Sequence, residues 1–434
     1  MSFFLKALGF DPKKHSVRTE IVAGITTFLT MAYILSVNPL IFSALEPLGM
    51  PNDAVFTATA IAAIAGTLIM AFLARLPYGL APGLGLNAFF VYTVCLGLGK
   101  SWQFALTAIL IEGIIFIILT LTDVREAIVN AIPNSLKNAI GAGLGLFIAF
   151  IGLENANIIV DDPATLVTMS LTDPKAKLCL IGLAITGVLF ILKMKGAMLL
   201  GIILTAIIGI PMGVTEFNGL VSMPPSIEDI RFQFTLDQVF SLDMLMVVFT
   251  FLFFDMFDTI GTVVGVSKKT GAMTADGKIP GVKKIFMADA VATVVGACAG
   301  TSTTTTFVES ASGVAEGGRT GLTAFVIACG FILSLFFSPL FLALRYATAP
   351  ALIIVGLFMM SPIKEIDFED YSESIPAFIT IILMPLAYSI SDGIMLGMIS
   401  YVVLNAICGK FKKISIMMWI LAILFVIRYA VPVV

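Results

Sequence analysis

Apolar runs of about 20 residues recur along almost the whole chain, and this feature most constrains its fold. A helix of that length crosses the hydrocarbon core of a bilayer. Of the 434 residues, 59 % are hydrophobic and 12 % are charged, whereas soluble domains average about 25 % charged residues. The pattern predicts an all-α polytopic membrane protein surrounded by lipid and excludes a soluble enzyme. The net charge of −3 offers no basic field for nucleic acid.

Fourteen segments are expected to cross the membrane. They lie near 21–44, 54–74, 80–98, 103–122, 136–154, 177–193, 197–213, 243–266, 284–300, 302–316, 320–340, 345–361, 375–390 and 392–408. A further apolar run, 414–432, follows a basic stretch. The sequence leaves open whether this run spans the bilayer or lies on its surface.

The distribution of Lys and Arg predicts the orientation. With the N-terminus in the cytoplasm and alternating spans, 19 of the 25 basic residues fall on the cytoplasmic side, as the positive-inside rule requires. The acidic loop 362–373 also falls there and is the weak point, although acidic residues carry little topogenic weight. We expect a multi-pass protein of the cell membrane with a cytoplasmic N-terminus.

The two halves of the chain resemble each other. The polar linker 214–242 separates seven segments from seven, and Lys195–Ile202 resembles Asp392–Ile399. An odd number of segments makes the second half inverted, and inverted repeats are typical of transporters. The alternative is a chance similarity of two Gly/Met/Leu runs, but the equal segment numbers favour a repeat.

The third and tenth segments cannot form regular helices. The third contains Ala81-Pro-Gly-Leu-Gly-Leu-Asn87, and the tenth contains a threonine run from Thr301 that ends near Glu309. Asn87 and Glu309 both lie 66 residues after the expected start of the first segment of their half (87 − 21 and 309 − 243). Extended backbone at membrane depth has to line a cavity or be buried in protein. A binding site is therefore expected here, with glycine-mediated helix packing as the alternative.

The eighth segment carries two acidic residues three positions apart, Asp255 and Asp258, which share a helix face. A carboxyl group at membrane depth is costly when charged and is functional by default, so both are candidate proton carriers. The alternative is a pair of structural carboxylates. In the first segment, Thr27 is a candidate binding residue, although it can also simply bond to its own helix.

Three motifs make the sequence similar to a known family. They are Asp255-Met-Phe-Asp258-Thr-Ile-Gly-Thr262, the Thr301–Gly313 run and Ala81-Pro-Gly-Leu-Gly-Leu-Asn87. In this order they resemble the AzgA-like purine permeases, a branch of the nucleobase–cation symporter family 2. The similarity extends over nearly the whole chain.

The resemblance implies a fold like that of the uracil permeases, with fourteen segments in two inverted seven-segment repeats and short extended pieces in segments 3 and 10. A core domain would comprise 21–122 and 243–340, and a gate domain 136–213 and 345–408. Residues 1–20 would form a cytoplasmic N-terminus, 214–242 an extracytoplasmic linker and 409–434 an apolar C-terminal segment. A homodimer through the gate domain is also implied.

The resemblance also assigns roles to residues. The acidic positions of the family fall on Asp258 and Glu309, and its polar third-segment position falls on Asn87. Thr27 lies near the place of a histidine in the uracil permeases, so their proton route does not transfer directly. A carboxylate such as Glu309 can accept two adjacent N–H groups of a purine, and Phe307 can offer a stacking face.

The expected function is uptake of guanine, hypoxanthine or adenine coupled to H⁺, with Asp255, Asp258 and Glu309 in the coupling and no cofactor or metal. An anion transporter of the sulfate type shares this architecture, but Asp258 and Glu309 would repel an anion. An intramembrane enzyme would need a metal cluster or a Ser/His pair at span depth, and the one histidine, His15, precedes the first span. A channel fits the broken helices, but paired carboxylates favour coupled transport.

Overall fold

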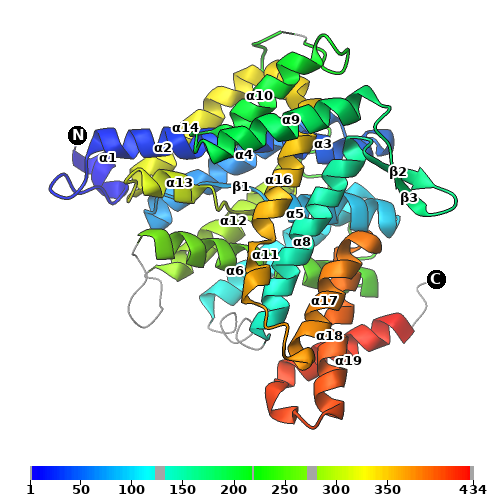
Figure 1. Cartoon of the computed structure of the whole chain (residues 1–434). Coiled ribbons are helices and arrows are strands. Elements are labelled where there is room, and N and C mark those ends of the chain that lie inside the picture. The colour runs from blue at the N-terminus through cyan, green and yellow to red at the C-terminus, as the bar shows by residue number, and fades with distance from the viewer. Residues whose placement is uncertain (1, 123–131, 218, 271–280, 431–434) are drawn as a thin grey trace.

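The computed structural model describes residues 2–122, 132–217, 219–270 and 281–430. Its helices fall on the expected segments, and Figure 1 shows them packed into one body. In the first half they are α1 (Ser2–Ala7), α2 (Val17–Met31), α3 (Ile34–Phe42), η1 (Ser43–Leu48), α4 (Asn52–Ile69), η2 (Met70–Ala74), α5 (Leu84–Ala88), η3 (Phe89–Gly97), α6 (Trp102–Leu121), α8 (Asn134–Asn155), α9 (Pro174–Ile191) and α10 (Ala197–Gly209).

The second half repeats the arrangement. Its helices are α11 (Leu242–Thr270), α12 (Val282–Ala299), α13 (Ser310–Ala315), α14 (Gly321–Ser334), η4 (Leu335–Phe337), α15 (Ser338–Ala343), η5 (Leu344–Ala347), α16 (Ala349–Met359), η6 (Ser361–Glu365), α17 (Tyr371–Leu386) and α18 (Ile390–Ile407), followed by η7 (Phe411–Lys413) and α19 (Ile416–Ala430). Within the described residues, six helices are long and apolar enough to cross a membrane by themselves.

Helices of the two halves pack against each other rather than forming separate bodies. In one group α12 contacts α4 and α6, and α14 contacts α2 and α4; in the other, α8 contacts α16 and α17. In Figure 1, α8 and α16 run steeply across the direction of α2, α9 and α10. We call the first set the core group and the second the gate group; the two groups meet where α5 and α11 approach α8.

Two short strands join the halves at the broken segments. Strand β1 (Leu80–Pro82) pairs antiparallel with β4 (Thr304–Thr306), and Pro82 lies opposite Thr304. Both residues lie 61 positions after the expected start of the first segment of their half (82 − 21 and 304 − 243). An antiparallel pairing that sets equivalent positions opposite each other is what a twofold axis relating inverted repeats produces. The predicted extended pieces in segments 3 and 10 are confirmed.

The loops contain features that periodicity did not predict. Residues 155–176 include a hairpin of β2 (Ile159–Asp162) and β3 (Leu166–Met169), with β3 fully exposed. The acidic loop 362–373 lies beside the basic stretch, because Asp370 pairs with Lys410 at 3.4 Å and Lys413 at 3.0 Å. Both segments therefore reach the same end of the molecule, as the predicted topology requires.

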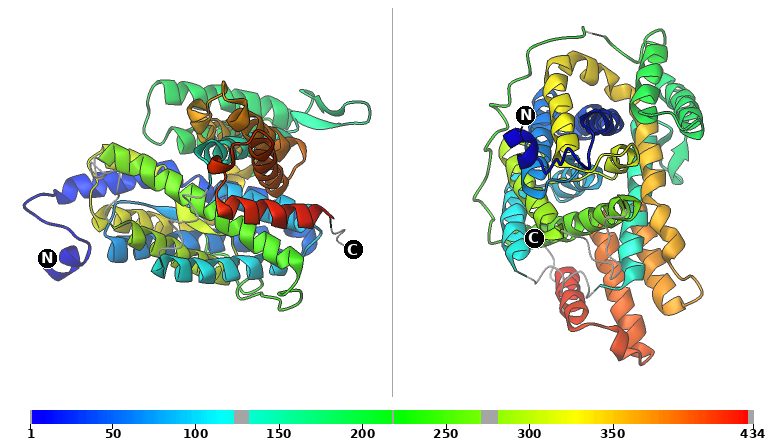
Figure 2. Two further views of the ribbon diagram at one scale, coloured as in Figure 1. Left: turned by 90° about the horizontal axis from the view of Figure 1, so that it is seen from below. Right: turned by 90° about the vertical axis from the view of Figure 1, so that its left-hand side faces the viewer.

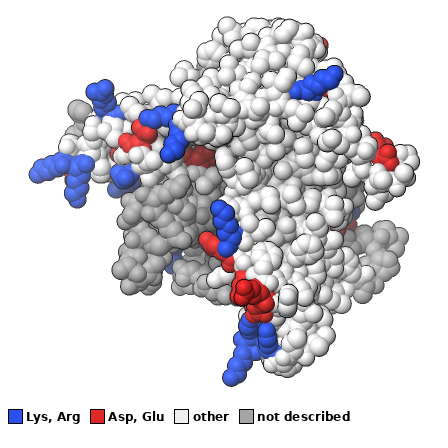
Figure 3. All heavy atoms as spheres, viewed as in Figure 1, with Lys and Arg blue, Asp and Glu red and all other residues white. Residues whose placement is uncertain are grey.

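The surface is largely apolar. Figure 3 shows a largely uncharged face, with Lys and Arg gathered near the N-terminal end and at the lower end and single basic side chains at the centre and upper right. The C-terminal helix α19 lies at the periphery in Figure 2 and buries Met418, Leu421 and Phe425. Its opposite face, including Ile416 and Ile423, is exposed. An exposed apolar face suits contact with lipid.

Candidate functional site

The backbone N–H and C=O groups of the two broken segments form hydrogen bonds with each other where the segments cross. Beyond the β1–β4 ladder, the Phe307 amide donates to the Gly79 carbonyl at 2.9 Å and the Gly83 amide donates to the Thr303 carbonyl at 3.0 Å. The Ser310 hydroxyl accepts from the Gly79 amide at 3.0 Å. Non-helical backbone is tolerated at membrane depth when protein partners replace the missing bonds. The crossing is therefore a rigid platform inside the molecule.

Threonine hydroxyls of this platform donate to carboxylates on three surrounding helices. Thr305 donates to Asp258 of α11 at 3.1 Å, and Thr306 donates to Asp289 of α12 at 2.8 Å. Thr303 donates to Glu112 of α6 at 3.2 Å. The sequence reasoning did not single out Glu112 or Asp289, both fully buried. Their signal was present, since each is the one acidic residue of a membrane-spanning helix.

Glu309 is the N-cap of α13 and lies three residues after Thr306, the last residue of β4. Its Oε1 accepts from the Tyr33 hydroxyl at 2.7 Å. Tyr33 occupies the break between α2 and α3, so the first segment reaches the site through this phenol. Glu309 and Asp258 are both partly exposed, in contrast to Glu112 and Asp289. Two carboxylates with accessible surface thus flank β4.

Asn87 lies opposite, within α5. Its Oδ1 accepts a bond from Ser302 Oγ, which ties it to the residues just before β4. Its buried Nδ2 has no hydrogen-bond partner among the described residues. An amide N–H₂ left unpaired inside a protein is a donor available to a ligand. Asn87 lies in the first turn of α5, which begins at Leu84 because the pairing of β1 ends at Pro82.

The other predicted residues belong to the packing around the platform. Thr27 is fully buried, and its Oγ1 lies 2.2 Å from where a Cβ on Gly313 would be. The glycine therefore lets α2 and α13 touch. Asp255 is fully buried and accepts from Thr259 at 3.4 Å. Phe307 is 6 % exposed and joins the apolar core.

An aromatic ring and a gate helix close over the start of α5. A Cβ on Gly85 would lie 2.7 Å from Phe254 Cζ and 3.2 Å from Leu144 Cδ2. Phe254 comes from α11, whereas Leu144 comes from α8 of the gate group. Gly85 is thus needed for close approach, and the site lies at the junction of core and gate.

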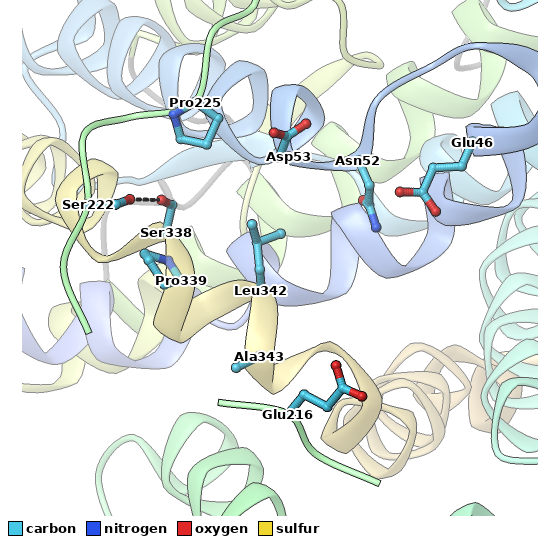
Figure 4. Close-up of a pocket in the computed structure, with 10 residues that line it drawn as sticks. All are labelled: Glu46, Asn52, Asp53, Glu216, Ser222, Pro225, Ser338, Pro339, Leu342 and Ala343. Carbon is cyan, nitrogen blue, oxygen red and sulfur yellow. Dashed lines mark hydrogen bonds between the residues drawn. The ribbon is translucent and has the colours of Figure 1, made fainter. Parts of the chain in front are cut away.

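A cavity of about 610 Å³ lies elsewhere, between η1, the start of α4, the linker and α15. Figure 4 shows its lining, which includes Glu46, Asp53 and Glu216 and the hydrogen bond between Ser222 and Ser338. None of the site residues described above lines it. We place the candidate site at the β1–β4 crossing. There the partly exposed carboxylates can accept hydrogen bonds from a ligand, and the unpaired amide can donate one.

The chain is similar in sequence to known permeases. Residues 18–396 match the model of a family described as the permease family. The guanine/hypoxanthine permease PbuO of Bacillus subtilis (strain 168) is 46 % identical, over 95 % of this chain and 97 % of that protein. The adenine permease AdeP of Escherichia coli (strain K12) is 41 % identical, over 96 % of this chain and 94 % of that protein.

Solved structures of lower identity share the architecture. The transmembrane domain of the cyanobacterium bicarbonate transporter BicA has a TM-score of 0.64 at 14 % identity and covers 88 % of this chain and 97 % of that one. The murine Solute Carrier 26 family member A9 anion transporter also scores 0.64, at 12 % identity, with 94 % and 72 % covered. The inverted-repeat fold expected from the sequence is confirmed, and the chain is an integral membrane protein.

Proposed function

The chain belongs to the permease family, and we propose from that premise that it carries purine nucleobases across the membrane. Relatives similar over almost its whole length are named for guanine, hypoxanthine and adenine. The observation that carries the proposal at the level of residues is the pair of partly exposed carboxylates, Asp258 and Glu309, beside the crossing of the two broken segments. A permease moves its substrate unchanged, so the proposal includes no catalytic residue or cofactor.

Purine recognition follows from the hydrogen-bonding groups at the platform. A purine is a flat, largely neutral ring with donors and acceptors on its edge. Glu309 can accept adjacent N–H groups, and the unpaired Nδ2 of Asn87 can donate to a ring nitrogen or carbonyl. Tyr33 holds one oxygen of Glu309 and so orients the carboxylate. Phe254 and Phe307 supply apolar surface beside these groups.

Proton coupling is the second part of the proposal. Asp258 and Glu309 flank the same strand, and a charge at membrane depth is costly. A carboxyl group that binds a proton together with the substrate and releases both on the other side lowers that cost during the crossing. Asp255 lies one turn from Asp258 and is fully buried, so we assign it a supporting role in this coupling.

An elevator-type movement of the core against the gate is the third part. The platform belongs entirely to the core group, and α8 of the gate group closes over it through Leu144. Displacement of the core along α8 would carry the site from one side to the other. We further propose a homodimer through the gate domain, in the cell membrane and with a cytoplasmic N-terminus.

The solved neighbours raise an alternative, because both are named as anion transporters. Their likeness at 12–14 % identity concerns the fold. At the β1–β4 crossing of this chain, the partly exposed charged groups are the acidic Asp258 and Glu309. Carboxylates repel an anion, so a neutral nucleobase fits the site better.

Uptake of radiolabelled purine tests the proposal. Cells that lack their own purine permeases and produce this protein should accumulate guanine or hypoxanthine, and a proton uncoupler should abolish the accumulation. Glu309→Gln keeps the size of the side chain but removes its charge, and uptake should fall to background while membrane insertion persists. Glu228→Gln, which changes an exposed loop carboxylate, is the matched control and should transport normally. Near-normal uptake by Glu309→Gln would refute the assignment.

A further inference from the structure

We propose that Tyr388 and Tyr92 form a gating contact that closes one end of the path between core and gate. Their rings meet edge to face, with centroids 5.4 Å apart. Tyr388 lies between α17 and α18 of the gate group, and Tyr92 lies in η3 of the core group. The inference rests on the proposed movement of core against gate, and it identifies a contact that has to break when the two separate.

Tyr388 is anchored firmly to the gate. Its hydroxyl donates to Glu154 Oε2 of α8 at 2.5 Å. Its ring also contacts two rings of α8 edge to face, with centroid distances of 5.4 Å to Phe147 and 6.0 Å to Phe150. Edge-to-face aromatic pairs are favourable beyond the area they bury. Three side chains of one gate helix thus hold the phenol ring in position.

Tyr92 belongs to the core group through its backbone. It is 8 % exposed and follows Asn87 by five residues on the same continuous helical segment, α5 and η3. A displacement of the platform therefore moves Tyr92 with it. The Tyr92–Tyr388 contact consequently reports directly on the position of the site relative to α8.

Two backbone features indicate that this region is built for more than packing. Tyr388 has a φ of 51°, in the left-handed region that a non-glycine residue adopts at a cost. The η3 segment is wound as a π-helix over Phe89–Gly97, a form that is rare and frequently marks functional sites. The left-handed backbone of Tyr388 lies on the gate side of the contact, and the π-helix lies on the core side. The unusual backbone therefore occurs where the core and gate groups meet.

The predicted topology places this contact at the extracytoplasmic end. Segment 3 runs outward towards residue 98, segment 5 runs outward towards Glu154, and residues 388–391 connect the outer ends of the last two segments. The ion pair between Lys195 and Glu316, 2.7 Å apart, joins the gate and core groups at the opposite end. Tyr388 is therefore an outer gate residue, and its contact opens when the site faces outward.

A native cysteine allows a direct test. Cys95 follows Tyr92 by three residues and is 3 % exposed, so it should react with a thiol reagent only when this end opens. The experiment uses the full chain with Cys179, Cys298, Cys329 and Cys408 replaced by alanine. A membrane-impermeant maleimide is applied to intact cells and, separately, to inverted vesicles.

Tyr388→Ala and Tyr92→Ala should each raise the rate of Cys95 labelling in intact cells about twofold to tenfold, as loss of one aromatic pair implies. Because both changes remove the same contact, the double variant should label no faster than the faster single variant. Tyr388→Phe keeps the ring and should stay closer to the parent. Lys195→Ala, which breaks the contact at the other end, should not raise labelling from this side.

Unchanged labelling in both alanine variants, or effects that simply multiply in the double variant, would overturn the proposal. Faster labelling in inverted vesicles alone would also contradict it, because the contact would then face the cytoplasm. If Tyr388→Ala fails to insert, the smaller change Tyr388→Leu removes the same aromatic contact. Purine uptake by the Cys95-only parent is measured in parallel. Absent uptake together with the predicted labelling refutes the purine proposal. Normal uptake together with unchanged labelling refutes the gating contact between Tyr92 and Tyr388.

Discussion

Tyr33 shows how a single residue can connect three segments of the chain. It lies at the break between α2 and α3, and its phenol reaches Glu309 at the start of α13. The sequence predicted Glu309 from its position in the repeat, but it predicted the first segment as one continuous helix. Met31-Ala-Tyr33 contains no Pro or Gly that would reveal the break. The role of Tyr33 depends on a tertiary contact between residues 276 positions apart.

Loss of the Tyr33 hydroxyl should weaken purine binding. In Tyr33→Phe the ring remains, but Glu309 loses the donor that orients one of its oxygens. Hydrogen bonds to charged groups contribute about 1.5–3 kcal/mol, so the KM for purine uptake should rise about tenfold or more. Tyr401→Phe is the matched control, since Tyr401 donates to Glu373 within the gate. An unchanged KM in Tyr33→Phe would show that the phenol plays no part in recognition.

At the scale of elements, hydrophobic length predicted the helices, and local chemistry predicted the two broken ones. Pro82 and the glycines of segment 3, and the β-branched run of segment 10, oppose helix formation, so β1 and β4 were expected as extended pieces. Hydrophobicity carries no information about which threonine faces which helix. For that reason the contacts of Thr303 with Glu112 and of Thr306 with Asp289 appeared only in the structure. The exposed hairpin of β2 and β3 likewise has no core-facing pattern to reveal it.

The contact between the loop before α17 and the stretch before α19 gives a pH prediction. Hydrogen bonds from Ser372 and from Lys413 hold the pKa of Asp370 below its ordinary value of 3.8. A carboxyl group whose pKa is lowered by folding stabilises the fold at pH values above its ordinary pKa. This stabilisation is lost as the pH falls through the folded-state pKa. The bond to Asp370 raises the pKa of Lys413 above 10.5, so its contribution is present below that pH and lost above it.

Asp370→Asn should therefore lower the Tm of the detergent-solubilised protein by a small, constant amount between about pH 5 and pH 9. The difference from the parent should shrink below about pH 4, where the carboxyl group of the unfolded chain begins to bind a proton, and it should vanish as the pH falls through the lowered folded-state pKa. The effect is small because exposed ion pairs contribute little. Thermal unfolding of both proteins across this pH range measures it. A difference that grows on acidification would show that the ionised carboxylate of Asp370 does not stabilise the fold.

At the scale of the whole molecule, two ion pairs of equal length occupy different places. Lys195 and Glu316 join gate to core, whereas Lys100 and Asp243 lie within the core, and both pairs are 2.7 Å apart. An elevator movement separates the first pair and leaves the second intact. The Lys195–Glu316 pair can therefore be used to test the movement, and the Lys100–Asp243 pair can serve as its control.

A reversible cross-link between Lys195→Cys and Glu316→Cys should stop purine transport, and reduction should restore it. The same short bifunctional thiol reagent applied to Lys100→Cys and Asp243→Cys should leave transport intact. Both experiments use a background without the native cysteines. Full transport with the first link completely formed would mean that the core does not move against the gate.

Proton-coupled purine uptake by the isolated protein tests the central claim most directly. Purified protein in sealed, sodium-free vesicles is given radiolabelled guanine or hypoxanthine with an acidic outer buffer. We predict that the purine accumulates inside only while the proton gradient lasts, and that Glu309→Gln abolishes accumulation. One proton moving across 100 mV supplies about 2.3 kcal/mol, enough for roughly fifty-fold accumulation. Equal purine concentrations on both sides despite the gradient, or accumulation that appears only when sodium is added, would contradict the account.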